Sequence, residues 1–144
     1  RIASASAAPS QAALTIARRN ADILNAPVEF LTSDWFAALA GRRFDLIVGN
    51  PPYIAAADPH LARGDVRFEP LTALAAGRDG LADLRQLTAA ARNHLRPGGV
   101  LLLEHGYDQA DAVRALLRES GISRPQSWPD LAGIPRVSGG ELSE

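Results

Sequence analysis

Apolar residues recur at helical spacing in three stretches of the chain. In residues 10–24, Ser10 stands where a helix cap is expected, and alanine, leucine and isoleucine side chains follow along one face. Residues 83–95 show the same spacing and run into the helix-stopping sequence Arg-Pro-Gly-Gly at 96–99, and residues 109–120 lead into a glycine. The pattern predicts three amphipathic helices.

Short runs dominated by apolar residues lie between these helices and are typical of strands. Four stretches have this character, residues 1–7, 28–32, 44–50 and 100–105, and two further weak strands are predicted around residues 126–128 and 136–138. The runs at 44–50 and 100–105 are nearly continuous, as in buried strands of a parallel sheet, and the other four are weaker. Residues 35–41 predict one or two helical turns closed by Gly41.

Strands that alternate with helices at this spacing predict an α/β fold with crossover helices and a mostly parallel sheet. No repeat or linker divides the chain, so we expect one domain over residues 1–144. Ligands of such sheets bind at the carboxyl ends of the strands. Asp34, Asn50 and Glu104 are polar residues at such ends.

Composition narrows the possible functions. The 144 residues are 47% hydrophobic, and the formal net charge of -1 disfavours binding to nucleic acid or to an anionic membrane. No apolar run approaches the ~20 residues that a membrane span needs. The absence of cysteine excludes disulfides and thiolate metal sites and fits a cytosolic protein. The three histidines are too scattered to predict a metal site, and only His105 is expected to face a cleft.

The segment FDLIVGNPPYI joins a predicted buried strand to a turn made of Asn50, Pro51, Pro52 and Tyr53. An isolated Asn-Pro-Pro sequence can simply end a strand with a stiff turn. The turn also sets an amide beside a flat aromatic ring at the edge where ligands bind, which makes it the main candidate for chemistry.

These residues carry a family resemblance. NPPY after a buried strand resembles the motif of class I methyltransferases that use S-adenosylmethionine and methylate a planar nitrogen, including DNA adenine and protein glutamine methyltransferases. The longer run at 33–85, with LRPGGVLLLEHGYDQ at 95–109, is similar to the release factor glutamine methyltransferases, and the likeness extends from about residue 12 to residue 139. It implies a Rossmann-like α/β sheet, mostly parallel with an antiparallel C-terminal strand.

The resemblance also implies an activity and a partner. It points to methyl transfer from S-adenosylmethionine to the glutamine side chain of the Gly-Gly-Gln motif in peptide-chain release factors. Such an enzyme acts in the cytoplasm, in translation termination, and needs no metal, no membrane and no direct contact with DNA.

A carboxamide nitrogen is a poor nucleophile, so a methyl-transfer site must hold and orient it. The side-chain oxygen of Asn50 and the backbone carbonyl of Pro51, which Pro52 biases toward an extended conformation, can accept its two hydrogens. Tyr53 offers a face for the planar group. We therefore expect residues 50–53 to form the catalytic turn.

By resemblance, Asp34 and Trp35 contact the adenine of the cofactor, with Asn50 also among the cofactor-binding residues. A carboxylate can accept from the adenine amine, and an indole supplies apolar contact area. Alternatively, Ser33 or Asp34 caps the short helix that follows, and both roles are compatible.

The chain also departs from the family pattern. The glycine-rich loop after the first strand would precede Arg1, and the acidic residue that holds the ribose would fall near Ala8, where residues 4–11 contain no Asp or Glu. The N-terminal helical domain is missing as well. We therefore expect a partial methyltransferase domain without its first strand.

Two alternatives remain at this stage. A DNA adenine N6-methyltransferase would need a basic recognition region, which the net charge does not supply. A non-catalytic remnant would keep the substrate loop, fail to bind the cofactor and tend to aggregate.

Overall fold

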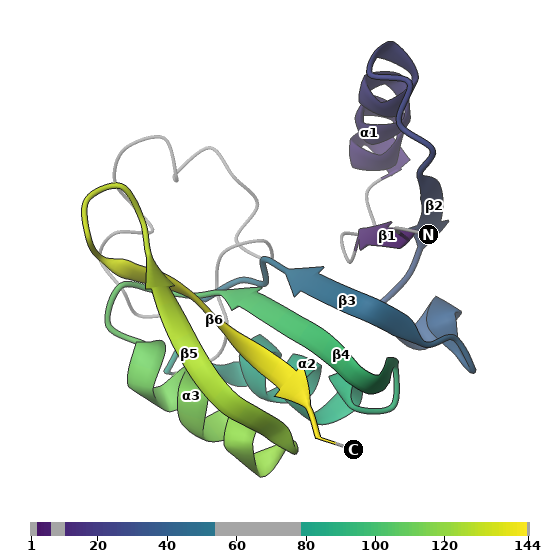
Figure 1. The fold of residues 1–144 in the computed structure, drawn as a ribbon. Helices are drawn as coiled ribbons and strands as arrows, with labels where there is room; N and C mark the ends of the chain where they lie inside the picture. The colour runs from purple at the N-terminus through teal and green to yellow at the C-terminus, as the bar shows by residue number, and fades with distance from the viewer. Residues whose placement is uncertain (1–2, 7–10, 54–78, 144) are drawn as a thin grey trace. The chain divides into compact units, whose positions relative to one another are not determined.

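The computed structural model describes residues 3–6, 11–53 and 79–143 (Figure 1). The chain divides into two compact units, Arg1–Arg42 and Arg43–Glu144. Residues 54–78, which follow the NPPY turn and belong to the run at 33–85, lie outside the described residues, as does Ala8.

The first unit contains a two-stranded parallel sheet and one long helix. Its elements are β1 (Ala3–Ser6), α1 (Gln11–Ile23), β2 (Glu29–Thr32) and the 3₁₀ turn η1 (Ala37–Leu39). Strand β1 pairs with β2 from Ala3 opposite Glu29 to Ser6 opposite Thr32. Because Leu14 and Ala21 are the buried residues of α1, the helix packs through one face, as its apolar spacing predicts.

The second unit is a four-stranded sheet with two helices. Its elements are β3 (Phe44–Gly49), α2 (Ala82–Ala91), β4 (Leu95–Glu104), α3 (Ala110–Glu119), β5 (Ile122–Pro129) and β6 (Pro135–Leu142). The strand order is β3-β4-β6-β5. Figure 1 shows α2 and α3 on the same side of this sheet.

Strand directions confirm the predicted fold class. Strand β3 is parallel to β4, whereas β6 is antiparallel to both of its neighbours, β4 and β5. Three strands therefore run in one direction and the C-terminal strand runs in the other. The fold is α/β with a mixed sheet.

The core of this unit lies between the sheet and the two helices. Its buried apolar side chains alternate along β4 and recur on the inner faces of the helices: Leu84, Leu87, Ala91, Leu95, Leu101, Leu103, Val113, Leu117 and Ile122. This alternation fixes which face of β4 meets the helices, and with it the direction in which the strand ends point.

Two sequence-based expectations were wrong in detail. The Arg-Pro-Gly-Gly sequence at 96–99 lies inside β4 and does not precede it, because Phe44 opposes Leu95 while Leu46 opposes Val100, so the four residues bulge out of the ladder. Gly98, with φ +75°, supplies the left-handed backbone that this bulge needs.

The strand at 44–50 was expected to be buried. Within the described residues β3 is instead an edge strand, and Leu46 and Val48 are 51% and 69% exposed. A continuous apolar run cannot distinguish a central strand from an edge strand.

Candidate functional site

The NPPY turn begins where β3 ends, after Gly49. The Pro51 side chain is fully buried and anchors the turn, Pro52 and Tyr53 are partly exposed, and Asn50 is exposed. Within the described part of the chain, neither the Asn50 side chain nor the Pro51 carbonyl accepts a hydrogen bond. The two predicted acceptors therefore sit on an anchored segment, and no residue that the structure describes donates to either of them.

The ring of Tyr53 is held by side chains from two neighbouring strands. Its hydroxyl donates to Oε1 of Glu104, at the end of β4, over 3.1 Å, and accepts from Nη2 of Arg136, in β6, over 3.5 Å. The Arg136 guanidinium also lies 5.6 Å from the ring centroid, within cation–π range.

Burial raises the pKa of the Tyr53 phenol, and the Glu104 carboxylate raises it further, while Arg136 opposes the shift. The phenol is therefore neutral at physiological pH. Because its hydroxyl already donates to Glu104 and accepts from Arg136, Tyr53 is suited to present a ring face and not to exchange a proton.

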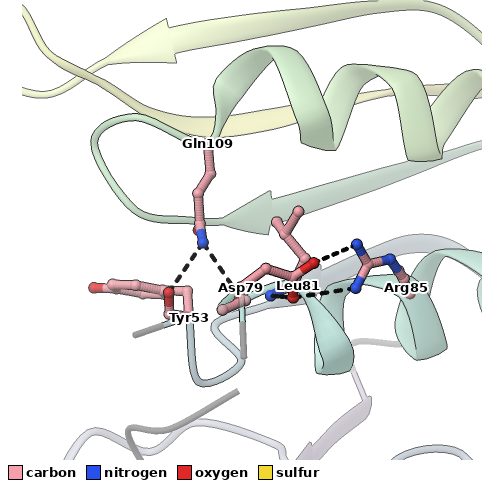
Figure 2. A network of polar contacts seen from close by, with 6 residues as sticks. Tyr53, Asp79, Leu81, Arg85 and Gln109 are labelled. Atoms are coloured by element: carbon pink, nitrogen blue, oxygen red, sulfur yellow. Dashed lines mark hydrogen bonds and ion pairs between the residues drawn. The ribbon is translucent and has the colours of Figure 1, made fainter. Parts of the chain in front are cut away.

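The side chain of Gln109 ties the Tyr53 backbone to two other segments. Its Nε2 donates to the carbonyl oxygens of Tyr53, at 3.0 Å, and Gly80, at 3.3 Å, while its Oε1 accepts from the Gly106 N–H at 2.8 Å. Figure 2 shows the two amide contacts fanning out from the start of α3. One amide thus joins the NPPY turn, the approach to α2 and the loop after β4.

Asp79 orders the backbone beside this contact. Its Oδ1 accepts from the Leu81 N–H over 3.1 Å, and its carboxylate binds both terminal nitrogens of Arg85 at 3.2 and 2.6 Å (Figure 2). The hydrogen bond from Arg85 lowers the pKa of Asp79 to about 2. The carboxylate therefore stays ionised and fixes the chain that enters α2.

His105 does not face a cleft, contrary to the expectation from sequence. Its side chain is fully buried, and its ring nitrogens lie 2.8 Å from the Gly106 carbonyl oxygen and 2.8 Å from Oγ of Ser138. The Ser138 hydroxyl is also hydrogen-bonded to the Ser127 hydroxyl, which accepts from the Arg114 guanidinium. Burial lowers the pKa of His105, so the ring is neutral and joins β4 to β6 inside the unit.

Asp34 and Trp35 belong to the other unit. Asp34 is exposed, and Trp35 is partly exposed with φ +47°. Oγ of Ser33 accepts from the Ala38 N–H at 3.0 Å and donates to the Trp35 carbonyl at 2.8 Å. The residue at the N-cap of η1 is Phe36, without a side-chain cap hydrogen bond, so neither Ser33 nor Asp34 is the cap that the sequence suggested. Ser33 still accepts from one backbone N–H of η1, and the Asp34 side chain is exposed.

Sequence reasoning missed Gln109 and Arg136, whose partners are distant in the chain. An acidic residue shortly before a predicted helix was a readable capping signal at Asp79. No group of three or more potential metal ligands occurs in the parts that the structure describes. Among the same residues, no helix is long and apolar enough to cross a membrane.

Comparison with known proteins shows which proteins this chain resembles. The Methyltransferase small domain model matches residues 5–64. The release factor glutamine methyltransferase of Burkholderia pseudomallei is 55% identical over 140 residues, which cover 92% of this chain and 49% of that protein.

Solved structures agree with the sequence comparison. The release factor-specific protein-(glutamine-N5) methyltransferase of Alicyclobacillus acidocaldarius is 29% identical, with a TM-score of 0.51 over 90% of this chain and 74% of that one. A Pyrococcus furiosus methyltransferase superposes with a TM-score of 0.72 at 16% identity, covering 100% of this chain and 64% of its own, which supports the fold. The chain is therefore similar in sequence to release factor glutamine methyltransferases, and it spans about half the length of the curated relatives that it matches.

Proposed function

We propose that the natural protein containing this chain transfers a methyl group from S-adenosylmethionine to the glutamine side chain of the Gly-Gly-Gln motif in peptide-chain release factors. The observation that carries the proposal is the anchored NPPY turn, in which Asn50 is exposed and the Tyr53 hydroxyl is held by Glu104. Relatives about 55% identical to this chain are named release factor glutamine methyltransferases, which supports a release factor glutamine as the methyl acceptor. Such an enzyme would work in the cytoplasm, where translation terminates.

Asn50 and Pro51 would orient the substrate amide. The Asn50 side-chain oxygen and the Pro51 carbonyl each accept one of the two amide hydrogens, which aims the nitrogen at the methyl carbon. A nitrogen–carbon bond forms as the sulfur–carbon bond of the methyl donor breaks, and the nitrogen then loses a proton to solvent. Pro52 stiffens the turn, and the Tyr53 ring supports the flat amide.

Asp34 and Trp35 would hold the adenine of S-adenosylmethionine, which supplies the methyl group when bound. The exposed Asp34 carboxylate has the acceptor oxygens that an exocyclic amine requires, and the partly exposed indole adds apolar area. Asn50 would also lie near the cofactor. On this proposal residues 1–144 form part of one methyltransferase domain.

Asn50→Ala tests the assignment in the natural protein. The change removes an acceptor aimed at the substrate nitrogen, so methyl transfer to a release factor should fall by ~10²-fold or more while cofactor affinity stays within a few-fold. Transfer is measured with labelled S-adenosylmethionine, and the modified glutamine is identified by peptide mass spectrometry.

The matched control is Asn93→Ala, which deletes the same side chain at an exposed position after α2. It should leave the rate unchanged. Equal rates for Asn50→Ala and wild type would remove Asn50 from the reaction. Labelled methyl in adenine-containing duplex DNA, at a rate comparable with that in the release factor, would favour the DNA methyltransferase alternative.

A further inference from the structure

We propose that Gln109 is a positioning residue for the NPPY turn, holding the Tyr53 carbonyl so that Asn50 and Pro51 stay in the orientation that the substrate amide requires. This inference rests on the proposed function and adds a residue to it that lies outside the motif. Its starting point is the pair of hydrogen bonds from Nε2 of Gln109 to the carbonyls of Tyr53 and Gly80.

The polar atoms of the Gln109 amide contact three backbone groups in separate segments. Both carbonyl contacts use the Nε2 donor, and the Oε1 acceptor meets the Gly106 N–H. Half-buried amides that satisfy several backbone groups at once resist rearrangement, because a displaced carbonyl would lose a hydrogen bond away from bulk water.

The support behind Gln109 is rigid. The residue directly precedes α3, whose Val113 and Leu117 side chains are fully buried in the core. The Gly106 N–H fixes the amide from the other side. The donor therefore points from a packed helix, and the turn is held against the body of the unit.

Two prolines connect the Tyr53 carbonyl to the acceptors on Asn50 and Pro51, so a displacement of that carbonyl can reach them. Proline fixes φ near −65°, so Pro51 and Pro52 remove two of the soft torsions between Asn50 and Tyr53. Pro51 is also buried, which anchors the other end of the turn. The torsions left free between the two ends are ψ of Pro51 and Pro52 and the torsions of Tyr53, so a shift at the Tyr53 carbonyl can be passed on to the Pro51 carbonyl and Asn50. Misplacement by about 1 Å can cost a reaction ~10²-fold.

Gln109→Glu is the sharpest substitution because the side chain keeps its size and its Oε1 acceptor for Gly106. It loses the donor, and it places a carboxylate against two carbonyl oxygens. Gln86→Glu is the matched control, since it makes the same chemical change on an exposed position of α2. Gln109→Met, which removes donor and acceptor without adding charge, is the second variant if the first fails to fold.

A direct readout of the contact is the carbonyl carbon signal of Tyr53 in protein labelled with ¹³C-carbonyl tyrosine. The chain has two tyrosines, so Tyr107→Phe assigns the spectrum. We expect Gln109→Glu to shift the Tyr53 signal and Gln86→Glu to leave it in place. An unshifted Tyr53 signal in both Gln109 variants would overturn the proposal.

The kinetic readout separates positioning from a merely structural role. In the natural protein, Gln109→Glu should lower kcat for release factor methylation by about tenfold or more, with cofactor affinity unchanged. In the Asn50→Ala background the same change should cost clearly less than in wild type, because one of the two acceptors through which it acts is gone. Equal losses in both backgrounds, or a shifted carbonyl signal with wild-type kcat, would overturn it.

These readouts also distinguish this proposal from the proposed function. If the wild-type protein methylates no release factor, the proposed function is wrong, and the carbonyl shift still decides whether Gln109 holds the turn. If the wild type is active and Gln109→Glu matches it, the function stands and the positioning role is wrong.

Discussion

Tyr53 shows how one residue can be fixed by groups that the sequence does not place near it. Its hydroxyl is hydrogen-bonded to Glu104 and Arg136, and its carbonyl is hydrogen-bonded to Gln109. Residues of β4, of β6 and at the start of α3 therefore all contact it. A hydrogen bond to a carboxylate is stronger than one between neutral groups. The ring orientation that the proposed reaction uses therefore depends on Glu104.

A double-mutant cycle tests this dependence. Tyr53→Phe removes the phenol donor and should lower the free energy of unfolding by about 1–2 kcal/mol, because it leaves a partly buried carboxylate without its partner. Glu104→Ala should cost at least about 1 kcal/mol less in the Tyr53→Phe background than in wild type. Urea unfolding at neutral pH gives both values.

Glu119→Ala, at an exposed position that ends α3, serves as the reference for losing a surface carboxylate. It should change stability by no more than about 0.5 kcal/mol in either background. Strictly additive costs for Tyr53→Phe and Glu104→Ala would mean that the 3.1 Å contact between the two side chains does not contribute to stability.

Contiguity explains which site residues could be predicted from the sequence. The four residues of NPPY are adjacent in the sequence, so the motif can be recognised without the fold. The structure places it at the end of a strand, as expected. Gln109 and Arg136 reach Tyr53 only through the folded sheet, and no local signal marks them. His105 was misread because its position at a strand end does not tell whether its ring points outward or into the core.

At the scale of elements, helices were predicted more accurately than strand boundaries. The apolar spacing located α1, α2 and α3 to within a few residues, because one buried face is enough to define an amphipathic helix. The Arg-Pro-Gly-Gly sequence was taken for a helix stop, but pairing with β3 draws it into β4 as a bulge. Pairing with a distant strand overrode the local preference.

Strand β6 depends on close backbone approach at Gly139. A Cβ added there would lie 2.0 Å from the Leu101 carbonyl oxygen and 2.7 Å from Cδ2 of Leu102. Gly139→Ala should therefore disrupt the β4–β6 pairing and lower the free energy of unfolding by at least about 2 kcal/mol. Because β6 carries Arg136, the contact with Tyr53 should weaken too.

The control for this change is Gly133→Asn in the turn between β5 and β6. A Cβ at Gly133 meets nothing within 4 Å, and asparagine tolerates the φ of +82° better than other residues with a side chain. Its melting temperature should fall much less than that of Gly139→Ala. Similar losses in the two variants would indicate that glycine entropy, and not the approach of β4, sets the requirement.

At the scale of the whole chain, β3 is the edge strand of the sheet in the unit Arg43–Glu144, and a domain without its first strand is expected to leave this edge unpaired. Within the residues that the structure describes, β3 pairs only with β4, and its Leu46 and Val48 side chains are about half to two-thirds exposed. An edge strand with unpaired backbone groups and exposed apolar side chains favours pairing with another copy. Apolar runs report burial on average and cannot show on which side a strand lacks a neighbour.

We therefore expect the purified 144-residue chain to self-associate through β3 in a concentration-dependent manner, and Val48→Lys to shift it towards monomer. Lysine on an edge strand opposes pairing because a second strand would bury its charge. The melting temperature should hold, since the Val48 side chain is already 69% exposed. Sedimentation velocity at several concentrations measures the distribution of monomers and oligomers.

The control is Leu131→Lys, at a fully exposed position in the β5–β6 turn, which adds the same charge away from the edge and should leave self-association unchanged. Equal effects of the two lysines would attribute the change to net charge, and a wild-type chain that is monomeric at every concentration would show that the β3 edge is protected in solution.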